Sequence, residues 1–236
     1  MQLEEWAKRL TTNKLEVKAL LLDLDGTLVD SRDALREAGR AGFAAIGFAG
    51  INDDKVAFEV ARRLEQDLPL DDLFTEFDID EEAEERFLPA YLNAYYSAVI
   101  SESKLFPKVG QTLDILEQHF ILALVTLRYV VREQVLDQLQ HLGIKKHFRV
   151  VVTALDVEKP KPFPDAPLLA AKKLNIPISK CAIVGDSVVD IQAGKAAGAK
   201  TIGVLTGLFS LEELKKEKPD IIAANVNVLP GLLSGA

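Results

Sequence analysis

Short apolar runs alternate along this chain with longer amphipathic stretches. The runs are apolar on both faces, which is typical of parallel strands that helices cover on either side. Strands are predicted over residues 17–23, 120–126, 149–153, 181–186 and 200–205. Helical periodicity predicts helices over 130–142, 166–174 and 188–197. This alternation predicts a doubly wound α/β fold with a parallel, Rossmann-like sheet.

Residues 31–104 depart from this alternation, because they show helical patterning and no convincing buried strand. Amphipathic helices are predicted over 34–46, 55–68 and 81–100. We therefore expect an α/β core domain of residues 1–30 and 105–236, and an all-helical cap domain of residues 31–104 inserted directly after the first strand. The alternative is a set of extra helices packed on one face of the sheet.

Polar residues end three of the predicted strands, and they are Asp23, Thr126 and Asp186. In open α/β sheets, ligands bind beyond the carboxyl ends of the strands, so we expect the chemistry of the core domain at this edge. The hydroxyl of Thr126 and the amides that follow it could donate hydrogen bonds to phosphoryl oxygens. A purely structural threonine is the alternative.

The first strand leads directly into the sequence DLDGT, residues 23–27. Asp23 and Asp25 can both approach one metal ion, particularly where Gly26 lets the chain turn sharply. A carboxylate can also attack phosphorus as a nucleophile and form an acyl phosphate. An Asx-type turn is the structural alternative, but the position at the end of the most apolar strand favours a function.

A second acidic pair, Asp186 and Asp190, closes the strand predicted over 181–186. Asp190 is expected one turn into the following helix, facing back toward Asp186, so that both can supply magnesium ligands. Capping of that helix is the alternative for Asp186. The presence of Asp23 and Asp25 favours the metal site.

The segment KPKPFP, residues 159–164, offers a candidate cation. Prolines fix φ and stiffen the backbone, so a lysine among them can be held out on an extended arm toward an anion. Both Lys159 and Lys161 fit this description. A surface linker with solvated lysines is the alternative.

Composition narrows the function classes. The chain has 236 residues, 48% of them hydrophobic and 27% charged, which fits a globular protein. A net charge of −8 argues against nucleic-acid binding. No apolar run is long enough to span a membrane, the charged N-terminus does not resemble a secretory signal, and the single Cys181 allows no intrachain disulfide. We therefore expect a cytoplasmic protein; the sequence does not indicate its oligomeric state.

In chain order, Asp-x-Asp-Gly-Thr, a strand-terminal Thr, Lys-Pro-x-Pro and Gly-Asp-x-x-x-Asp resemble the four motifs of the haloacid dehalogenase superfamily. The helical segment is similar to that superfamily's small α-helical cap. The nearest subfamily resemblance is to phosphoglycolate phosphatase-like enzymes, from about Val17 to the C-terminus. The resemblance implies a Mg²⁺-dependent phosphatase that hydrolyses a small phosphorylated metabolite, a phosphoglycolate-like phosphomonoester, through an aspartyl phosphate.

The resemblance also implies a role for each motif residue. Asp23 is the implied nucleophile, and Asp25 the acid that protonates the leaving oxygen and then activates water. Mg²⁺ is expected on Asp23, on Asp186 and on the backbone carbonyl of Asp25, with Asp190 assisting directly or through water. Thr126, the Leu127 amide and Lys161 are expected to bind the phosphoryl group.

Some residues depart from the family pattern. Leu127-Arg128 stands where relatives commonly have Asn-Lys, so only a backbone contact is expected from Leu127. Lys161 is preferred to Lys159, because Pro164 and Asp165 then lead straight into the next helix. Residues 1–15 precede the first strand and are expected to form an extra helix laid against the core.

Two other functions remain open from the sequence. A phosphomutase of the β-phosphoglucomutase type keeps all four motifs, but would need a bisphosphate activator and release little phosphate. A catalytically silent regulatory domain of the same fold would have no need of a lysine and four carboxylates together. Arginines of the cap could contact an anionic leaving group, although helix-surface arginines are more often solvated; they are Arg36, Arg40, Arg62 and Arg63.

Overall fold

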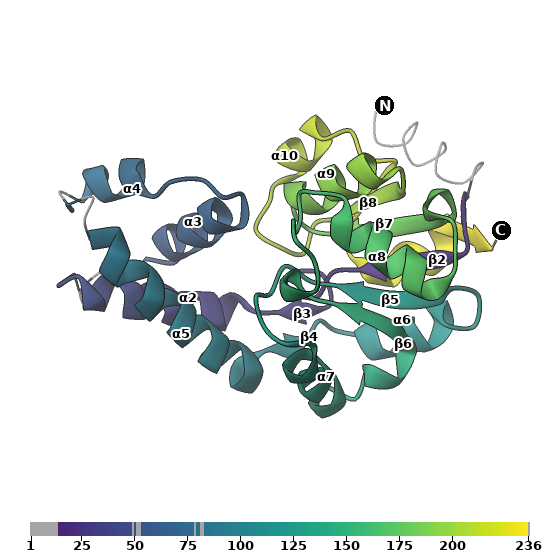
Figure 1. Cartoon of the computed structure of the whole chain (residues 1–236), viewed down its shortest axis with the longest axis horizontal. Helices are drawn as coiled ribbons and strands as arrows, with labels where there is room; N and C mark the ends of the chain where they lie inside the picture. The colour runs from purple at the N-terminus through teal and green to yellow at the C-terminus, as the bar shows by residue number, and fades with distance from the viewer. Residues whose placement is uncertain (1–13, 49, 51–52, 78, 81–82, 236) are drawn as a thin grey trace. The chain divides into compact units, whose positions relative to one another are not determined.

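The computed structural model describes residues 14–48, 50, 53–77, 79–80 and 83–235. Most of the helix expected over residues 1–15 falls on residues 1–13, outside the described part of the chain, and Leu15 is the first residue of strand β1 (Leu15–Val17). Two compact units are present (Figure 1). One contains the chain up to Leu28 together with Leu105–Ala236, and the other is Val29–Lys104. The second unit starts two residues before the segment 31–104 predicted from the sequence.

The first unit is built on a six-stranded sheet with the order β6-β5-β2-β7-β8-β9, in which every neighbouring pair is parallel. The strands are β2 (Ala19–Leu22), β5 (Ile121–Val125), β6 (Phe148–Val152), β7 (Cys181–Gly185), β8 (Lys200–Val204) and β9 (Ile221–Ala223). The predicted fold class is confirmed. Only β9 was not predicted within this sheet, because three apolar residues are too short a run to stand out.

Helices cover this sheet (Figure 1). They are α6 (Val109–Leu116), α7 (Arg132–His141), α8 (Asp165–Leu174), α9 (Val188–Ala197), α10 (Leu211–Lys216) and α11 (Leu229–Leu232), with 3-10 turns at Lys145–His147, Ala154–Asp156, Ile178–Lys180 and Val226–Val228. Helix α8 packs on β5 and β6, and α9 packs on β7 and β8. A small parallel pair, β1 (Leu15–Val17) with β10 (Leu233–Gly235), joins the two ends of the described chain.

Strand β2 determines where the polar residues that follow it lie. All four of its side chains are fully buried, and alternate residues face opposite sides of the sheet. Ala19 and Leu21 belong to the cluster beneath α8. Leu22 lies opposite Leu124 of β5 and opposite Val184 of β7. The residues after β2 therefore emerge between the carboxyl ends of β5 and β7, at the centre of the sheet.

The second unit is helical, as predicted, with α2 (Arg32–Ala45), α3 (Asp54–Glu65), α4 (Asp71–Glu76) and α5 (Glu84–Glu102). Its core contains the buried aromatic rings of Phe43, Phe74, Phe87 and Tyr91 among aliphatic side chains. Phe87 lies 5.0 Å from Phe43 and 5.3 Å from Phe74 between ring centroids, both in edge-on geometry, which is the favoured arrangement for such pairs. The pattern does not predict α4, which spans only six residues.

The chain enters and leaves the helical unit through two very short strands. These are β3 (Val29–Asp30) and β4 (Lys104–Leu105), which pair with each other in a two-stranded sheet. Next to them, the amide of Phe106 donates a hydrogen bond to the carbonyl of Leu28 at 3.0 Å. The two connections are therefore held side by side. Among the described residues, every helix is too short or too polar to cross a membrane.

Candidate active site

Asp23 and Lys161 form the centre of a charged cluster at the carboxyl edge of the sheet. The amide of Asp23 donates to the Val184 carbonyl at 2.9 Å, which places its carboxylate between β5 and β7. Lys161 Nζ lies 2.7 Å from Asp23 Oδ1 and 2.6 Å from Asp190 Oδ1. It also donates to the Val125 carbonyl at 3.2 Å. One buried ammonium thus joins the first, third and fourth motifs.

The two lysines of the proline-rich segment are separated by this geometry. Lys161 is buried, whereas Lys159 is exposed and its Nζ lies 5.5 Å from the centroid of the Phe163 ring. A buried ammonium requires charged partners, and Lys161 has two carboxylates. The structure therefore favours Lys161 as the cation of the cluster.

Asp190 is fixed by the start of helix α9. The hydroxyl of Ser187 donates to Asp190 Oδ2 at 2.8 Å, and the Asp190 amide donates to Ser187 Oγ at 3.3 Å. This reciprocal capping box satisfies donors at the helix N-terminus. Asp190 therefore caps its own helix with one oxygen and binds Lys161 with the other.

Asp186 is held by residues from two other loops. Thr27 Oγ1 donates to Asp186 Oδ1 at 2.8 Å. A Cβ atom at Gly207 would lie 1.6 Å from Asp186 Oδ2, and one at Gly26 would lie 2.3 Å from the same oxygen. Gly26 also has φ +74°, a conformation that side chains disfavour. Both positions require glycine, since any side chain would displace the carboxylate.

Asp25 is partnered by an arginine that stands outside the family pattern. Arg128 Nε donates to Asp25 Oδ2 at 2.6 Å, and Arg128 Nη2 donates to Asp25 Oδ1 at 2.7 Å. A third guanidinium nitrogen, Nη1, donates to Gln138 Oε1 of α7. The carboxylate of Asp25 is thus separate from the Lys161 cluster and has its own cation.

The predicted phosphate-binding loop follows β5. Thr126 is buried, and its amide donates to the Val152 carbonyl at 3.0 Å, so this amide serves the sheet. The amide of Leu127 donates no hydrogen bond to another part of the chain that the structure describes, and it remains available for an anion. The Leu127 side chain packs instead with the apolar cluster around Phe209 and Leu214. A role for Leu127 can come only from its backbone.

Burial and neighbouring charges set the protonation of the cluster. Burial raises the pKa of the Asp23 carboxyl to about 8; the Lys161 ammonium opposes this rise and the Asp190 carboxylate adds to it. Burial alone would lower the pKa of Lys161, but the carboxylates of Asp190 and Asp23 together hold it above its ordinary value. Lys161 is therefore a permanent cation of the site.

The cluster fits a divalent cation. One carboxylate oxygen from each of Asp23, Asp186 and Asp190 can be chosen so that all three lie within 4.8 Å of one another, and all three residues are buried. When they are ionised, three carboxylates against the one ammonium of Lys161 leave two uncompensated negative charges. Buried charge of this sign must be neutralised, and carboxylate oxygens are the ligands that Mg²⁺ prefers.

The raised pKa of Asp23 predicts a pH-dependent stability when no divalent cation is present. The carboxyl titrates near 3.8 in the unfolded chain and at about 8 in the fold. Between these values the folded protein keeps a proton that the unfolded chain has released, so stability is lost as pH rises toward the folded pKa. In chelator, Asp23→Asn should therefore become progressively more stable than the parent between about pH 5 and about pH 8, as measured by urea unfolding.

The exposed Asp137 provides a matched control for this prediction. Asp137→Asn makes the same chemical change at an exposed position, so a pH dependence shared by both variants would not come from the burial of Asp23. A constant difference for Asp23→Asn would show that burial does not hold the proton on Asp23.

Some residues of this site were not identified from the sequence. Gly207 carries no signal of its own, because only the folded loops bring it to Asp186. Ser187 stands three residues before Asp190, which is the spacing of a capping box, so this local signal could have identified it. Thr27 lies within the DLDGT string, where its spacing from Asp186 of 159 residues hides the contact. Arg128 was noted only as a departure, and its pairing with Asp25 depends on where the loop after β5 turns.

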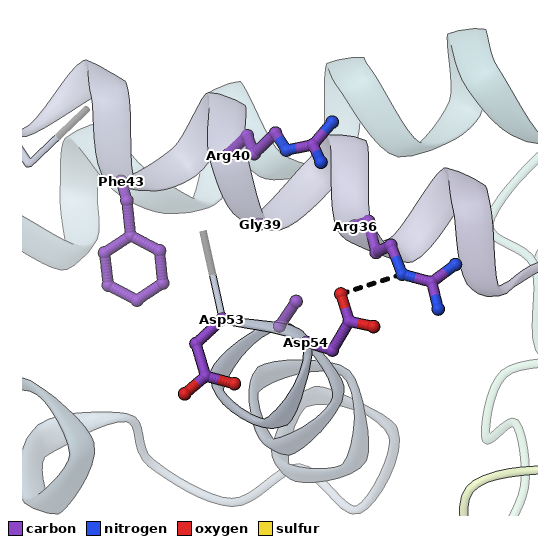
Figure 2. A pocket seen from close by; sticks show the side chains of 7 residues that line it. Arg36, Gly39, Arg40, Phe43, Asp53 and Asp54 are labelled. Atoms are coloured by element: carbon purple, nitrogen blue, oxygen red, sulfur yellow. Dashed lines mark hydrogen bonds and ion pairs between the residues drawn. The ribbon is translucent and has the colours of Figure 1, made fainter. Parts of the chain in front are cut away.

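The arginines of the helical unit are engaged within that unit. Arg36 Nε lies 2.8 Å from Asp54 Oδ1, beside a hollow of about 10 Å³ between α2 and α3 (Figure 2). Such a hollow has room for no more than about one water molecule. Arg40 pairs with Glu37, and Arg62 and Arg63 both pair with Glu59. These contacts favour a structural role for the four arginines.

Comparisons with known proteins identify the family of this chain. The family model described as haloacid dehalogenase-like hydrolase matches residues 20–204. Phosphoglycolate phosphatases of Shigella boydii and Escherichia coli are 34% and 33% identical to this chain, and each alignment covers 93% of this chain and 94% of the relative. A solved haloacid dehalogenase-like hydrolase from Streptococcus pneumoniae superposes with a TM-score of 0.73 at 23% identity, over 89% of this chain and 95% of that one.

The family match covers most of the sheet and every strand end at which the charged cluster lies. The predicted resemblance and the predicted enzyme class, a phosphatase with this fold, are confirmed. This chain belongs to the haloacid dehalogenase-like hydrolases.

Proposed function

We propose that this phosphatase hydrolyses a small phosphorylated metabolite, a phosphoglycolate-like phosphomonoester, through an aspartyl phosphate on Asp23 and with Mg²⁺ as its cofactor. The observation that carries the proposal is the buried contact of Asp23 with Lys161, beside Asp186 and Asp190 at the strand ends. The substrate class is supported by the relatives at 33–34% identity, which are named phosphoglycolate phosphatases.

The first half of the proposed reaction is transfer to the protein. A carboxylate oxygen of Asp23 attacks phosphorus while the bond from phosphorus to the leaving oxygen breaks. Asp25 gives a proton to that oxygen, so that the product leaves as an alcohol. Lys161 and the Leu127 amide offset the charge of the phosphoryl oxygens. Mg²⁺ bound by Asp23, Asp186 and Asp190 would neutralise the repulsion between an anionic nucleophile and an anionic substrate.

The second half returns the phosphoryl group to water. Asp25, now ionised, takes a proton from a water molecule as the water oxygen attacks phosphorus. The bond from phosphorus to the Asp23 oxygen then breaks, which restores the carboxylate and releases inorganic phosphate. The same residue acts first as acid and then as base, which requires a carboxylate that is partly open to solvent. Asp25 is half-buried, unlike Asp23.

Chelation tests the cofactor. Hydrolysis of p-nitrophenyl phosphate should vanish in excess chelator and return when Mg²⁺ is added, because the buried carboxylates lose their neutralising charge. Ca²⁺ should restore the rate poorly, since it accepts looser and higher coordination than in-line transfer tolerates. Phosphate release is the measurement. Full activity in chelator would contradict the proposed cofactor.

A panel of phosphorylated metabolites tests the substrate class in the presence of Mg²⁺. Phosphoglycolate should give the highest kcat/KM, and ethyl phosphate, which lacks the carboxylate, serves as the matched control. Equal values for the two compounds would refute a phosphoglycolate-like substrate while leaving the chemistry at Asp23 intact.

A further inference from the structure

We infer that Arg128 is a positioning residue for the carboxylate of Asp25, and that Gln138 holds Arg128 in place. The inference deepens the proposed function, because it assigns a role to a residue that acts through the proposed acid–base group. It starts from the two parallel hydrogen bonds of 2.6 and 2.7 Å between the guanidinium and Asp25.

The fork orients Asp25 without blocking it. A carboxylate has about four lone-pair positions on its two oxygens, and a bidentate arginine occupies one on each. Each oxygen therefore keeps a second lone pair for a proton. Two parallel bonds also fix the plane of the carboxylate, which a single contact does not. Asp25 is thus held in one orientation while it remains able to give and accept a proton.

The arginine is itself held on several sides. Its side chain is only 5% exposed, and its backbone carbonyl accepts a hydrogen bond from the Ala154 amide at 3.1 Å. Its own amide approaches Thr126 Oγ1 at 3.4 Å. On the far side of the guanidinium, the buried Gln138 of α7 accepts the bond from Nη1. Because the guanidinium of Arg128 is held in one position, it can hold the carboxylate of Asp25 in one orientation.

The two cations of the site therefore contact different carboxylates. Lys161 lies against the nucleophile Asp23 and against Asp190, whereas Arg128 lies against Asp25. Lysine is a point charge suited to offsetting phosphoryl charge, and arginine supplies a planar, geometry-specific contact. A lysine at position 128 would keep the charge but could not make both bonds.

The test is a double-mutant cycle with p-nitrophenyl phosphate in the presence of Mg²⁺. Arg128→Ala should lower kcat by about 10- to 100-fold, since misplacement of a reacting group by about 1 Å can cost about a hundredfold. KM should fall together with kcat, because hydrolysis of the phosphorylated protein then limits turnover. Nitrophenolate should appear as a burst, because the return of the phosphoryl group to water depends most on Asp25. In the Asp25→Asn background, Arg128→Ala should have almost no further effect.

Further variants guard against a simple folding defect. Arg128→Lys keeps charge and bulk, and should still lose most of the kcat that Arg128→Ala loses. Gln138→Met removes the acceptor of the Arg128 Nη1 hydrogen bond and keeps a similar side-chain volume. It should lower kcat by less than Arg128→Ala does. Arg132→Ala is the matched control, because this arginine pairs with Asp156 and contacts neither Asp25 nor Asp23. Its kcat should equal that of the parent.

Two results would overturn the inference. Full additivity of Arg128→Ala with Asp25→Asn would show that the residues act independently, and a raised KM with unchanged kcat would make Arg128 a substrate-binding cation. Failure of the proposed function looks different. In that case Asp25→Asn would form no phosphorylated protein, whereas failure of this inference alone would leave that adduct intact.

Discussion

Replacing Asp23 by Asn should abolish the release of phosphate. An amide does not attack phosphorus, and Asp190, which also contacts Lys161, is held in the N-terminal cap of α9 by Ser187. The variant should nevertheless fold, because Lys161 keeps its contact with Asp190. Phosphate release from p-nitrophenyl phosphate is the measurement, with urea unfolding to verify the fold.

Replacing Asp25 by Asn should instead arrest the reaction halfway. The leaving group p-nitrophenolate needs little protonation, so the phosphoryl group should still reach Asp23. The attacking water then lacks a base, and the loss of such help typically costs about a hundred- to ten-thousand-fold. Intact-mass spectrometry after an acid quench should show one added phosphate, mapped by peptides to Asp23. A phosphate on Ser31, Thr126 or a histidine would refute the assignment.

Replacing Lys161 by Met should have large effects on both activity and stability. The transferring group loses a buried cation, and the removal of one stabilising donor typically costs about a hundred- to a thousandfold in kcat. The carboxylates of Asp23 and Asp190 lose their shared partner, and breaking a buried pair typically costs about 3–5 kcal/mol. Phosphate release and urea unfolding, both at neutral pH, measure the two losses.

The neighbouring Lys159 gives a control within the same motif. Lys159→Met removes an exposed ammonium that lies over the ring of Phe163, so both kcat and stability should stay close to those of the parent. An equal loss of kcat in the two variants would show that the contact of Lys161 with Asp23 does not carry the chemistry.

Much of this fold could be predicted from local patterns. The five longer strands of the main sheet are apolar on both faces, and helix α9 begins and ends where its periodicity indicates. The strand ends also indicated where the polar residues of the site would lie. Strands β2 and β7 are parallel neighbours, so Asp23 and Asp186, which follow them, emerge at the same edge of the sheet. Helices with periodicity over two or more turns, and strands that are apolar on both faces, can be identified from the sequence.

What could not be predicted depends on contacts between distant segments. Strand β9 and helix α4 are too short for a periodic signal. The choice between Lys159 and Lys161 depends on which side chain is buried, and two lysines one residue apart look alike in a sequence. The fork from Arg128 to Asp25 joins residues 103 positions apart. Such pairs become visible only when the sheet has brought the loops together.

Because strands β3 and β4 pair at the two ends of the helical insertion, the insertion could be replaced as a unit. The chain leaves the sheet after Leu28 and returns at Phe106, where a hydrogen bond of 3.0 Å already joins the two sides. The entropic cost of bringing the two ends of such a segment together grows only slowly with its length, by about 0.6 kcal/mol for each doubling. Recombination at this point could therefore replace one insertion by another without moving a strand of the sheet. Asp23 and its neighbours would stay where β2 places them, because β2 lies before the insertion.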